Sequence, residues 1–180
     1  MSLLVVGTDG PLARALVDAV PPVRPDDVVA ALARERPTQL AILGLPAPAG
    51  ALGAIATETL ADLIEQMLHP AFAALRAAAA ADAPLRIALV CPAAGVLPDH
   101  RDGARSVVAA GLAMVGEVAA AAPALAVNVI AIADDVPADE AAATVRFALS
   151  DQAPSLNGAT IRLDGGRDAV LAAETRSEGD

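Results

Sequence analysis

Short apolar runs alternate with helical patterns along almost all of this 180-residue chain. Alternation of this kind favours an α/β architecture, a parallel β-sheet with helices on both faces. The first run, Leu3 to Val6, ends at a glycine-containing turn that leads into a helical pattern. Five strands are expected, at about 3–6, 39–45, 86–91, 127–132 and 160–163. Helices are expected at about 12–20, 26–36, 57–81, 104–122 and 139–150.

Two local signals refine these elements. Asp26 and Asp27 can provide the N-cap of the helix that Pro37 stops, after a proline-rich connector at 21–25. Pro70 is expected to kink the long helix 57–81, because proline lacks the N–H that continues a helix.

Length and composition indicate one domain with an apolar excess. A chain of 180 residues can form its own core, and we expect one domain over 1–173 with a polar tail at 174–180. Charged residues make up 19%, against about 25% in ordinary globular proteins. Either part of the apolar surface is buried against another chain, or abundant alanine inflates the apolar count. Composition leaves both readings open.

Charge and residue usage exclude several classes of function. The net charge of −10 disfavours binding to nucleic acids and to anionic membranes. The first residues carry no positive charge, and Pro123 and Asn128 interrupt the apolar stretch 118–133, so a soluble cytoplasmic protein is expected. The single cysteine, Cys91, ends an expected buried strand and is interpreted as an inert thiol. The two histidines lack ligand-like spacing, so no metal site is expected.

The second half of the chain resembles a known family. Its most specific segment is Leu156-Asn-Gly-Ala-Thr-Ile-Arg-Leu-Asp-Gly-Gly166, and residues 86–95 are similar to a strand that ends in a catalytic serine. From 57 to 168 the chain resembles the short-chain dehydrogenases/reductases, the SDR family. The resemblance implies a Rossmann-like parallel sheet.

The catalytic residues of that family are replaced here. The family uses Asn, Ser, Tyr and Lys; the tyrosine exchanges a proton with the substrate, and the lysine lowers the tyrosine's pKa and holds the nicotinamide ribose. This chain contains no tyrosine and no lysine. By resemblance, Met67, Pro92, Arg105 and Ala109 stand at the four positions. We therefore expect no catalytic residues, although Asp99 and His100 with Arg105 leave a relocated chemistry open.

The cofactor-binding half looks shortened as well. The turn Gly7 to Leu12 is one residue shorter than the family's phosphate-binding turn, and Asp9 puts a negative charge where phosphate would lie. Between Val20 and Gln39 there is room for one helix only, so the family's second and third strands are expected to be missing. The substrate lid is reduced to 134–138. We expect no cofactor-binding residues and no cofactor.

Helices 57–81 and 104–122 are retained, and in the family these elements build subunit interfaces. Helix 104–122 has only Arg105 and Glu117 to offer to water, while Ala110, Gly111, Ala113 and Gly116 would permit close approach of a partner. The resulting hypothesis is a non-catalytic subunit that assembles through these helices with a catalytically intact SDR paralogue. The alternative is a homodimeric or homotetrameric binding or regulatory module that uses the vacated cleft for a ligand.

Overall fold

A five-stranded parallel sheet forms the centre of the protein, as the alternating pattern predicts. The computed structural model describes residues 2–7, 9–17, 22–44, 50–81, 83–96 and 103–166. Neighbouring strands in the sheet follow chain order, and all four pairs are parallel. The strands are β1 (Leu3–Val6), β2 (Gln39–Leu43), β3 (Leu85–Pro92), β4 (Leu125–Ile132) and β5 (Thr160–Leu163).

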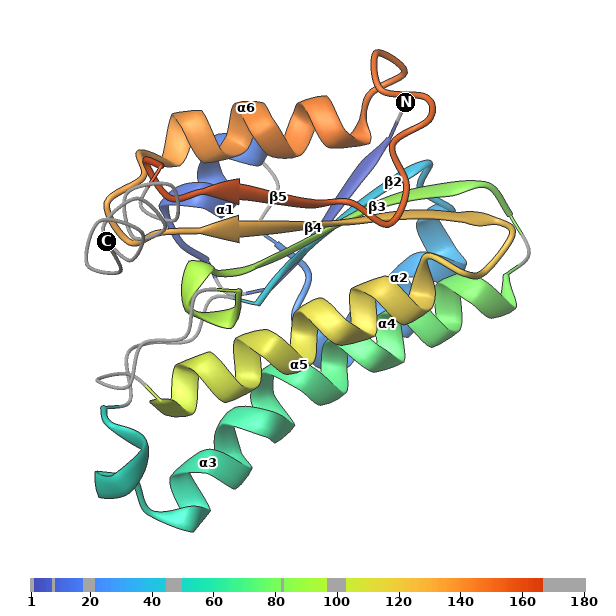
Figure 1. Ribbon diagram of the computed structural model, residues 1–180. Helices are drawn as coiled ribbons and strands as arrows, with labels where there is room; N and C mark the ends of the chain where they lie inside the picture. The colour runs from blue at the N-terminus through green and yellow to red at the C-terminus, as the bar shows by residue number, and fades with distance from the viewer. Residues whose placement is uncertain are drawn as a thin grey trace.

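Helices cover both faces of the sheet (Figure 1). On one face lie α1 (Pro11–Leu16) and α6 (Ala138–Leu149), where Arg146 of α6 donates to the carbonyls of Ala15 and Leu16. The other face carries α2 (Val28–Glu35), α4 (His69–Ala80) and α5 (Gly103–Ala119). This arrangement confirms the predicted architecture.

The strands β1 to β4 are mostly apolar on both faces because each face meets a helical layer. In β2, Leu40 and Ile42 point to the layer of α2, α4 and α5, whereas Ala41 and Leu43 point to α1 and α6. All four are buried. Full burial of one such aliphatic side chain stabilises the fold by about 1.5–3 kcal/mol, so both layers are held to the sheet mainly by apolar contact.

The sheet begins directly at β1, which pairs with β2 and, in the described residues, with no complete strand on its other side. The expected lack of the family's second and third strands is thus confirmed. Val23, interpreted above as part of a connector, makes a single parallel bridge to this outer edge. Its N–H donates to the Val5 carbonyl at 2.8 Å, and its carbonyl accepts from the Gly7 N–H at 3.1 Å.

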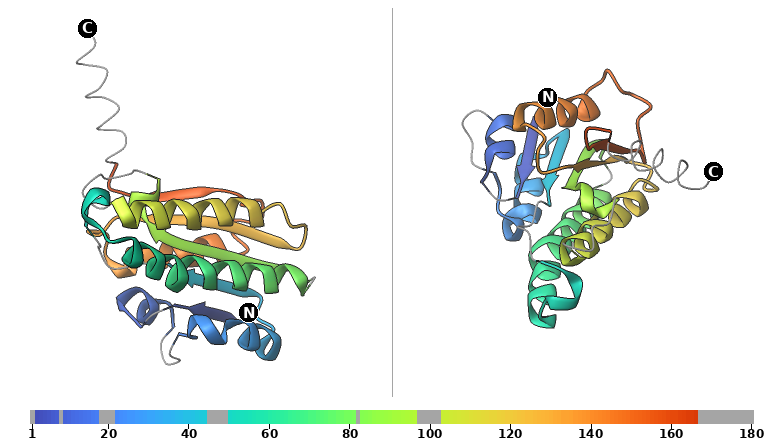
Figure 2. Two further views of the ribbon diagram at one scale, coloured as in Figure 1. Left: turned by 90° about the horizontal axis from the view of Figure 1, so that it is seen from below. Right: turned by 60° about the vertical axis from the view of Figure 1, so that its left-hand side comes forward.

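The helix expected at 57–81 is divided into α3 (Thr57–Leu63), a π-helical segment (Ile64–Leu68) and α4. Pro70 cannot donate a backbone hydrogen bond. Just before it the helical turn is one residue larger than in an α-helix, because the His69 N–H donates to the Ile64 carbonyl, five residues back. No residue of α3 or of the π-helical segment is fully buried. Figure 2 shows α3 projecting from the body of the domain.

The expected N-cap of α2 does not form. Asp27 occupies the capping position, but its side chain makes no capping hydrogen bond and instead pairs with Arg24 at 2.8 Å. The short 3₁₀ turn Pro25–Asp27 leads into the helix in place of a cap. At the other end Arg36 adopts a left-handed conformation, with φ of 44°, immediately before Pro37.

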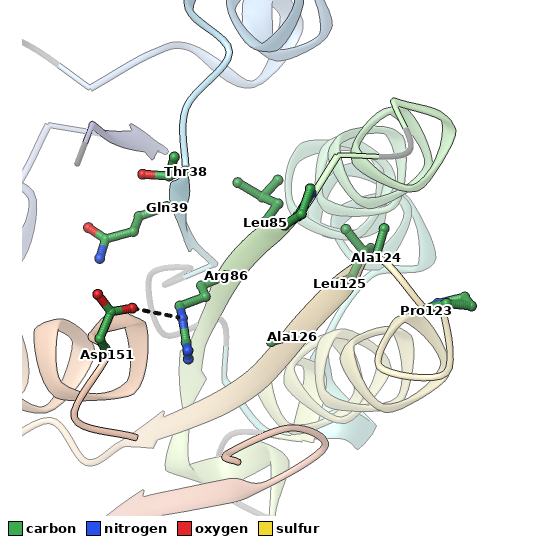
Figure 3. A pocket seen from close by; sticks show the side chains of 10 residues that line it. Thr38, Gln39, Leu85, Arg86, Pro123, Ala124, Leu125, Ala126 and Asp151 are labelled. Carbon is green, nitrogen blue, oxygen red and sulfur yellow. Dashed lines mark ion pairs between the residues drawn. The ribbon is translucent and has the colours of Figure 1, made fainter. Parts of the chain in front are cut away.

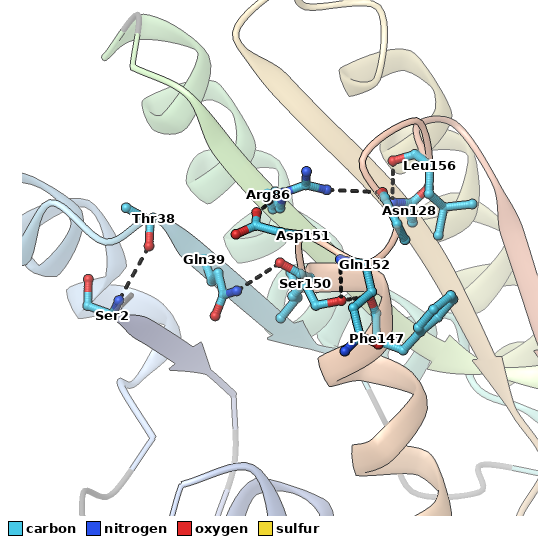
Figure 4. Close-up of polar contacts among 12 residues, drawn as sticks. Ser2, Thr38, Gln39, Arg86, Asn128, Phe147, Ser150, Asp151, Gln152 and Leu156 are labelled. Carbon is cyan, nitrogen blue, oxygen red and sulfur yellow. Dashed lines mark hydrogen bonds and ion pairs between the residues drawn. The ribbon is translucent and has the colours of Figure 1, made fainter.

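Polar side chains at the amino ends of three strands hold the loop that joins α6 to β5 (Figure 4). Gln39 donates to the Leu149 carbonyl at 2.8 Å, and Arg86 donates to the Ala153 carbonyl at 3.2 Å. Asn128, only 1% exposed, donates to the Leu156 carbonyl at 3.0 Å and accepts from the Ala159 N–H at 3.1 Å. This side chain therefore satisfies two backbone groups and positions the start of β5.

The substitution Asn128→Ala is expected to lower the free energy of unfolding by about 2–4 kcal/mol, because each buried polar group left without a partner costs about 1–3 kcal/mol. Urea unfolding followed by circular dichroism measures the change. Gln152→Ala, at an exposed position of the same loop, is the control and should alter stability by less than about 0.5 kcal/mol. Equal stability of the two variants would contradict this role for Asn128.

Candidate functional site

The carboxyl ends of the strands are the natural place to look for a site, since open α/β sheets bind ligands at that edge. Helices α1, α5 and α6 all begin there (Figure 1). Two features of the described residues lie at this edge: an ion pair between Arg105 and Asp134, and the junction between β1 and β2.

Arg105, in the first turn of α5, is buried instead of facing water as expected. Arg105 as a whole is 8% exposed. Its two terminal guanidinium nitrogens donate to the two carboxylate oxygens of Asp134 at 2.8 and 2.6 Å. Asp134 follows β4, and its side chain is 70% exposed. The two-pronged contact joins the start of α5 to the β4–α6 loop. The charge of the buried guanidinium is thus balanced by a carboxylate that largely remains in water.

A hollow of about 260 Å³ adjoins this ion pair. Apart from Arg105 and Asp134, the described residues of its wall are apolar and come from the start of α1, the end of β4, the following loop and the start of α6. They are Pro11, Leu12, Ile132, Ala133, Val136, Ala138 and Ala141. A hollow with one charged pair in an apolar wall can hold a small amphipathic molecule.

The junction between β1 and β2, called the switch point here, lies where the helix after β1 covers one face of the sheet and the helix after β2 covers the other, although the strand order itself does not reverse. Nucleotide-binding folds place their ligand in such a crevice. Here the cavity measures only about 30 Å³, roughly the volume of one water molecule. Leu112 packs against Gly44, where an added Cβ would lie 2.5 Å from Leu112 Cδ1. Met67 also lines the crevice.

Asp9, expected to repel a phosphate, is engaged by its own helix. Arg14 of α1 donates to its two carboxylate oxygens at 3.0 and 3.2 Å. This hydrogen bonding lowers the pKa of Asp9 and raises that of Arg14. Both side chains are exposed, so the pair is a solvated turn contact.

No known family profile matches the sequence, and no curated protein matches it either. Solved structures do match. An SDR-family oxidoreductase from Burkholderia thailandensis superposes with a TM-score of 0.80 at 21% identity, over 97% of this chain and 96% of that one. A short-chain dehydrogenase from Mycobacterium smegmatis gives 0.75 at 15% identity, over 90% and 91%, and levodione reductase gives 0.72 at 14%, over 93% and 97%.

The chain has a short-chain dehydrogenase/reductase fold. Within this SDR fold, the four positions assigned to the family's catalytic residues hold side chains that mostly belong to the core. Ala109 and Pro92 are buried, Met67 packs against the core from the π-helical segment, and Arg105 is tied to Asp134. Asp99 and His100 lie outside the described residues. The described part of the chain holds no cluster of three or more His, Cys, Asp or Glu residues suited to a metal ion.

A second hollow, of about 350 Å³, lies at the amino ends of β2, β3 and β4 (Figure 3). Arg86 lines it and approaches Asp151 at 3.8 Å. Arg86 also holds the Ala153 carbonyl, and neighbouring Gln39 holds that of Leu149. These groups serve the α6–β5 loop, so we assign this hollow a structural role.

Sequence reasoning missed both sets of polar contacts. The signal for the amino-end network was available, because Gln39, Arg86 and Asn128 are the polar residues in otherwise apolar strands. Asp134 gave no comparable signal: it follows a strand, as many loop carboxylates do, and its pairing with Arg105 is fixed only by the packing of α5. Among the described residues, no helix has both the length and the apolar character needed to cross a membrane.

Cys91 is expected to be unreactive in the folded protein. It is buried in β3, and this burial raises the pKa of its thiol to about 12. At pH 8 only about one thiol in ten thousand is then ionised, and the thiolate is the reactive form. A chromogenic disulfide reagent should label Cys91 only after urea is added. The raised pKa also affects stability. Between the ordinary thiol pKa of about 8.5 and the folded-state pKa of about 12, the Cys91 thiol ionises only in the unfolded chain, so the free energy of unfolding falls as the pH rises. Rapid labelling of the native protein at pH 8 would contradict the assignment.

Proposed function

We propose that this chain is a non-catalytic subunit that assembles with, and supports, a catalytically active short-chain dehydrogenase/reductase. Three features support the proposal: the residues at the catalytic positions, the small crevice at the switch point, and an exposed apolar surface on the helices that form interfaces in the family. The exposed apolar surface is the main support for the proposal, because such a surface favours assembly with another chain.

The positions of the four catalytic residues offer no replacement for proton transfer. Met67, Pro92 and Ala109 have no titratable group, and the guanidinium of Arg105 stays protonated at any physiological pH. The crevice between β1 and β2 is far smaller than a dinucleotide, and side chains of the core define its walls. Both features favour a protein that does not carry out hydride transfer by itself.

An apolar surface, termed here the α4–α5 face, is formed by Phe72 of α4 and by Val107, Met114 and Val118 of α5. Met114 is 65% and Val118 72% exposed. The three α5 residues share one side of the helix with Gly111, which faces Leu68; Phe72 lies one helical turn beyond Leu68. Exposed large apolar side chains grouped in this way are typical of protein interfaces.

The small residues of α5 have a different role from the expected one. Gly116 packs on the sheet, where an added Cβ would lie 2.8 Å from Val129 Cγ2, and Ala113 is buried. Of the four small residues expected to face a partner, Ala110, Gly111, Ala113 and Gly116, only the first two are partly exposed. Close packing of small residues therefore brings α5 onto its own sheet, and the large side chains of the α4–α5 face are left for a partner.

An SDR paralogue is the partner proposed, because in the family the helices that match 57–81 and 104–122 pack with their counterparts about a two-fold axis. A partner of the same fold offers the same helical pair. It would also bring the catalytic and cofactor-binding residues that are replaced here. The alternative, a homo-oligomeric module, predicts a partner identical to this chain.

The isolated chain is expected to bind neither NAD(H) nor NADP(H), since the switch-point crevice holds only about 30 Å³. Isothermal titration calorimetry tests this, with a catalytically intact SDR enzyme as the positive control. A dissociation constant in the micromolar range for either cofactor would overturn the proposed loss of cofactor binding.

The variant Met114→Glu is expected to dissociate the assembly. It places a charge in the centre of the α4–α5 face, and an unpaired charge buried at an interface costs several kcal/mol. Analytical ultracentrifugation measures the mass, and circular dichroism verifies the fold. Ala143→Glu, at an exposed position of α6 on the opposite side of the sheet, is the matched control and should keep the parent's mass.

The identity of the partner is tested by affinity capture of the tagged chain from its native cells. We expect mass spectrometry to identify an SDR protein that contains the Tyr-x-x-x-Lys pair, and Met114→Glu to remove it while Ala143→Glu retains it. Capture of this chain alone as an oligomer would favour the homo-oligomeric module. A monomeric parent, or a folded Met114→Glu variant of unchanged mass, would refute assembly through this face.

A further inference from the structure

The ion pair between Arg105 and Asp134 is unequal in its surroundings. The guanidinium side chain is 10% exposed, while the carboxylate side chain is 70% exposed. Removing a charge from water is costly unless a partner compensates it, so Arg105 requires an anion at this position. Asp134 depends less on this contact, because its carboxylate is already largely hydrated.

The hollow beside the pair extends the site beyond a salt bridge. It lies against both side chains and holds about 260 Å³. Seven further described residues of its wall, from four parts of the chain, are apolar, among them Leu12, Ile132 and Val136. A molecule that places an anionic head on Arg105 would therefore find apolar surface for a short hydrocarbon group.

We propose that this hollow binds small carboxylic acids with a short apolar chain, and that Asp134 occupies the carboxylate position when no ligand is bound. The planar guanidinium presents two parallel N–H donors, the arrangement that Asp134 already uses at 2.8 and 2.6 Å. An incoming carboxylate takes over these two hydrogen bonds, and Asp134 moves into water. No covalent step is involved, and the site does not depend on assembly with a partner.

Competition between Asp134 and the ligand for Arg105 determines how tightly the ligand is expected to bind. The ligand exchanges one carboxylate for another at Arg105, so the gain in the unaltered protein comes mainly from the apolar contacts. Displaced Asp134 and the nearby Asp139 and Glu140 also repel a second negative charge. The unaltered protein is thus expected to bind weakly, and removal of the competing carboxylate should strengthen binding.

Butyrate is a suitable probe, with butyramide as its uncharged counterpart of nearly the same shape. In the unaltered full chain, the Nε–Hε NMR signal of Arg105 should shift progressively with butyrate and not with butyramide. Asp134→Asn should bind butyrate at least about ten-fold more tightly, since a hydrogen-bonded charge contact is worth that factor or more. Arg105→Gln assigns this signal by removing it; in that variant the backbone amide signals of Ile132 and Val136, which line the hollow, should no longer shift with butyrate.

Asp9→Asn is the matched control, because it removes the carboxylate of another Arg–Asp pair, at an exposed turn. It should leave the affinity for butyrate unchanged. Equal responses to butyrate and butyramide, or an Asp134→Asn variant that binds no more tightly than the unaltered protein, would overturn the proposal. If Asp134→Asn fails to fold, the titration of the unaltered chain decides: an unmoved Arg105 signal refutes the site. None of these outcomes bears on the oligomeric mass, so this proposal and the subunit proposal fail separately.

Discussion

A parallel sheet is stable only when helices cover both of its faces, and this requirement shapes the whole domain. In the described part of the chain, β1 is the strand at the first edge of the sheet, and one connection joins it to β2. That connection supplies a helix to each face: α1 joins α6, and α2 joins α4. The helices that this connection supplies cover β1 and β2, whose residues are buried except at the first position of each strand.

The same arrangement determines what becomes of the two ends of the sheet. At the carboxyl ends of the strands, the helices after β1 and β2 still lie on opposite faces of the sheet. The space between these strands is nevertheless small, because Leu112 packs against Gly44 and Met67 lines the cavity. The usable space is displaced towards the end of β4, where Arg105 and Asp134 meet. At the amino edge, Gln39, Arg86 and Asn128 are committed to the loop before β5. The hollow beside Arg105 and Asp134 and the α4–α5 face are the two surfaces on which the proposals above rest.

Periodicity predicted the positions of the strands well, because short apolar runs mark the strands that both helical layers bury; β1 and β5 begin and end where the pattern placed them. Local chemistry was less reliable. Asp27 was expected to cap α2 but pairs with Arg24, since a carboxylate near a helix start has two competing partners. Arg105 was expected at the surface because charged residues usually are. Its burial depends on Asp134, 29 residues away in sequence, which no local pattern reveals. Whether a partner or a carboxylic acid binds likewise depends on molecules that the sequence does not contain.

The single bridge made by Val23 has a consequence for how the protein behaves at high concentration. A strand at the edge of a sheet displays unpaired N–H and C=O groups, which can pair with another chain and begin aggregation. In the described residues β1 pairs with β2 on one side and with no complete strand on the other, so its outer side is such an edge. Val23 occupies the Val5 carbonyl and the Gly7 N–H, and the flanking Pro22 has no N–H to extend a ladder. Val23 and the neighbouring Pro22 thus reduce the number of free backbone groups through which another chain could extend the sheet.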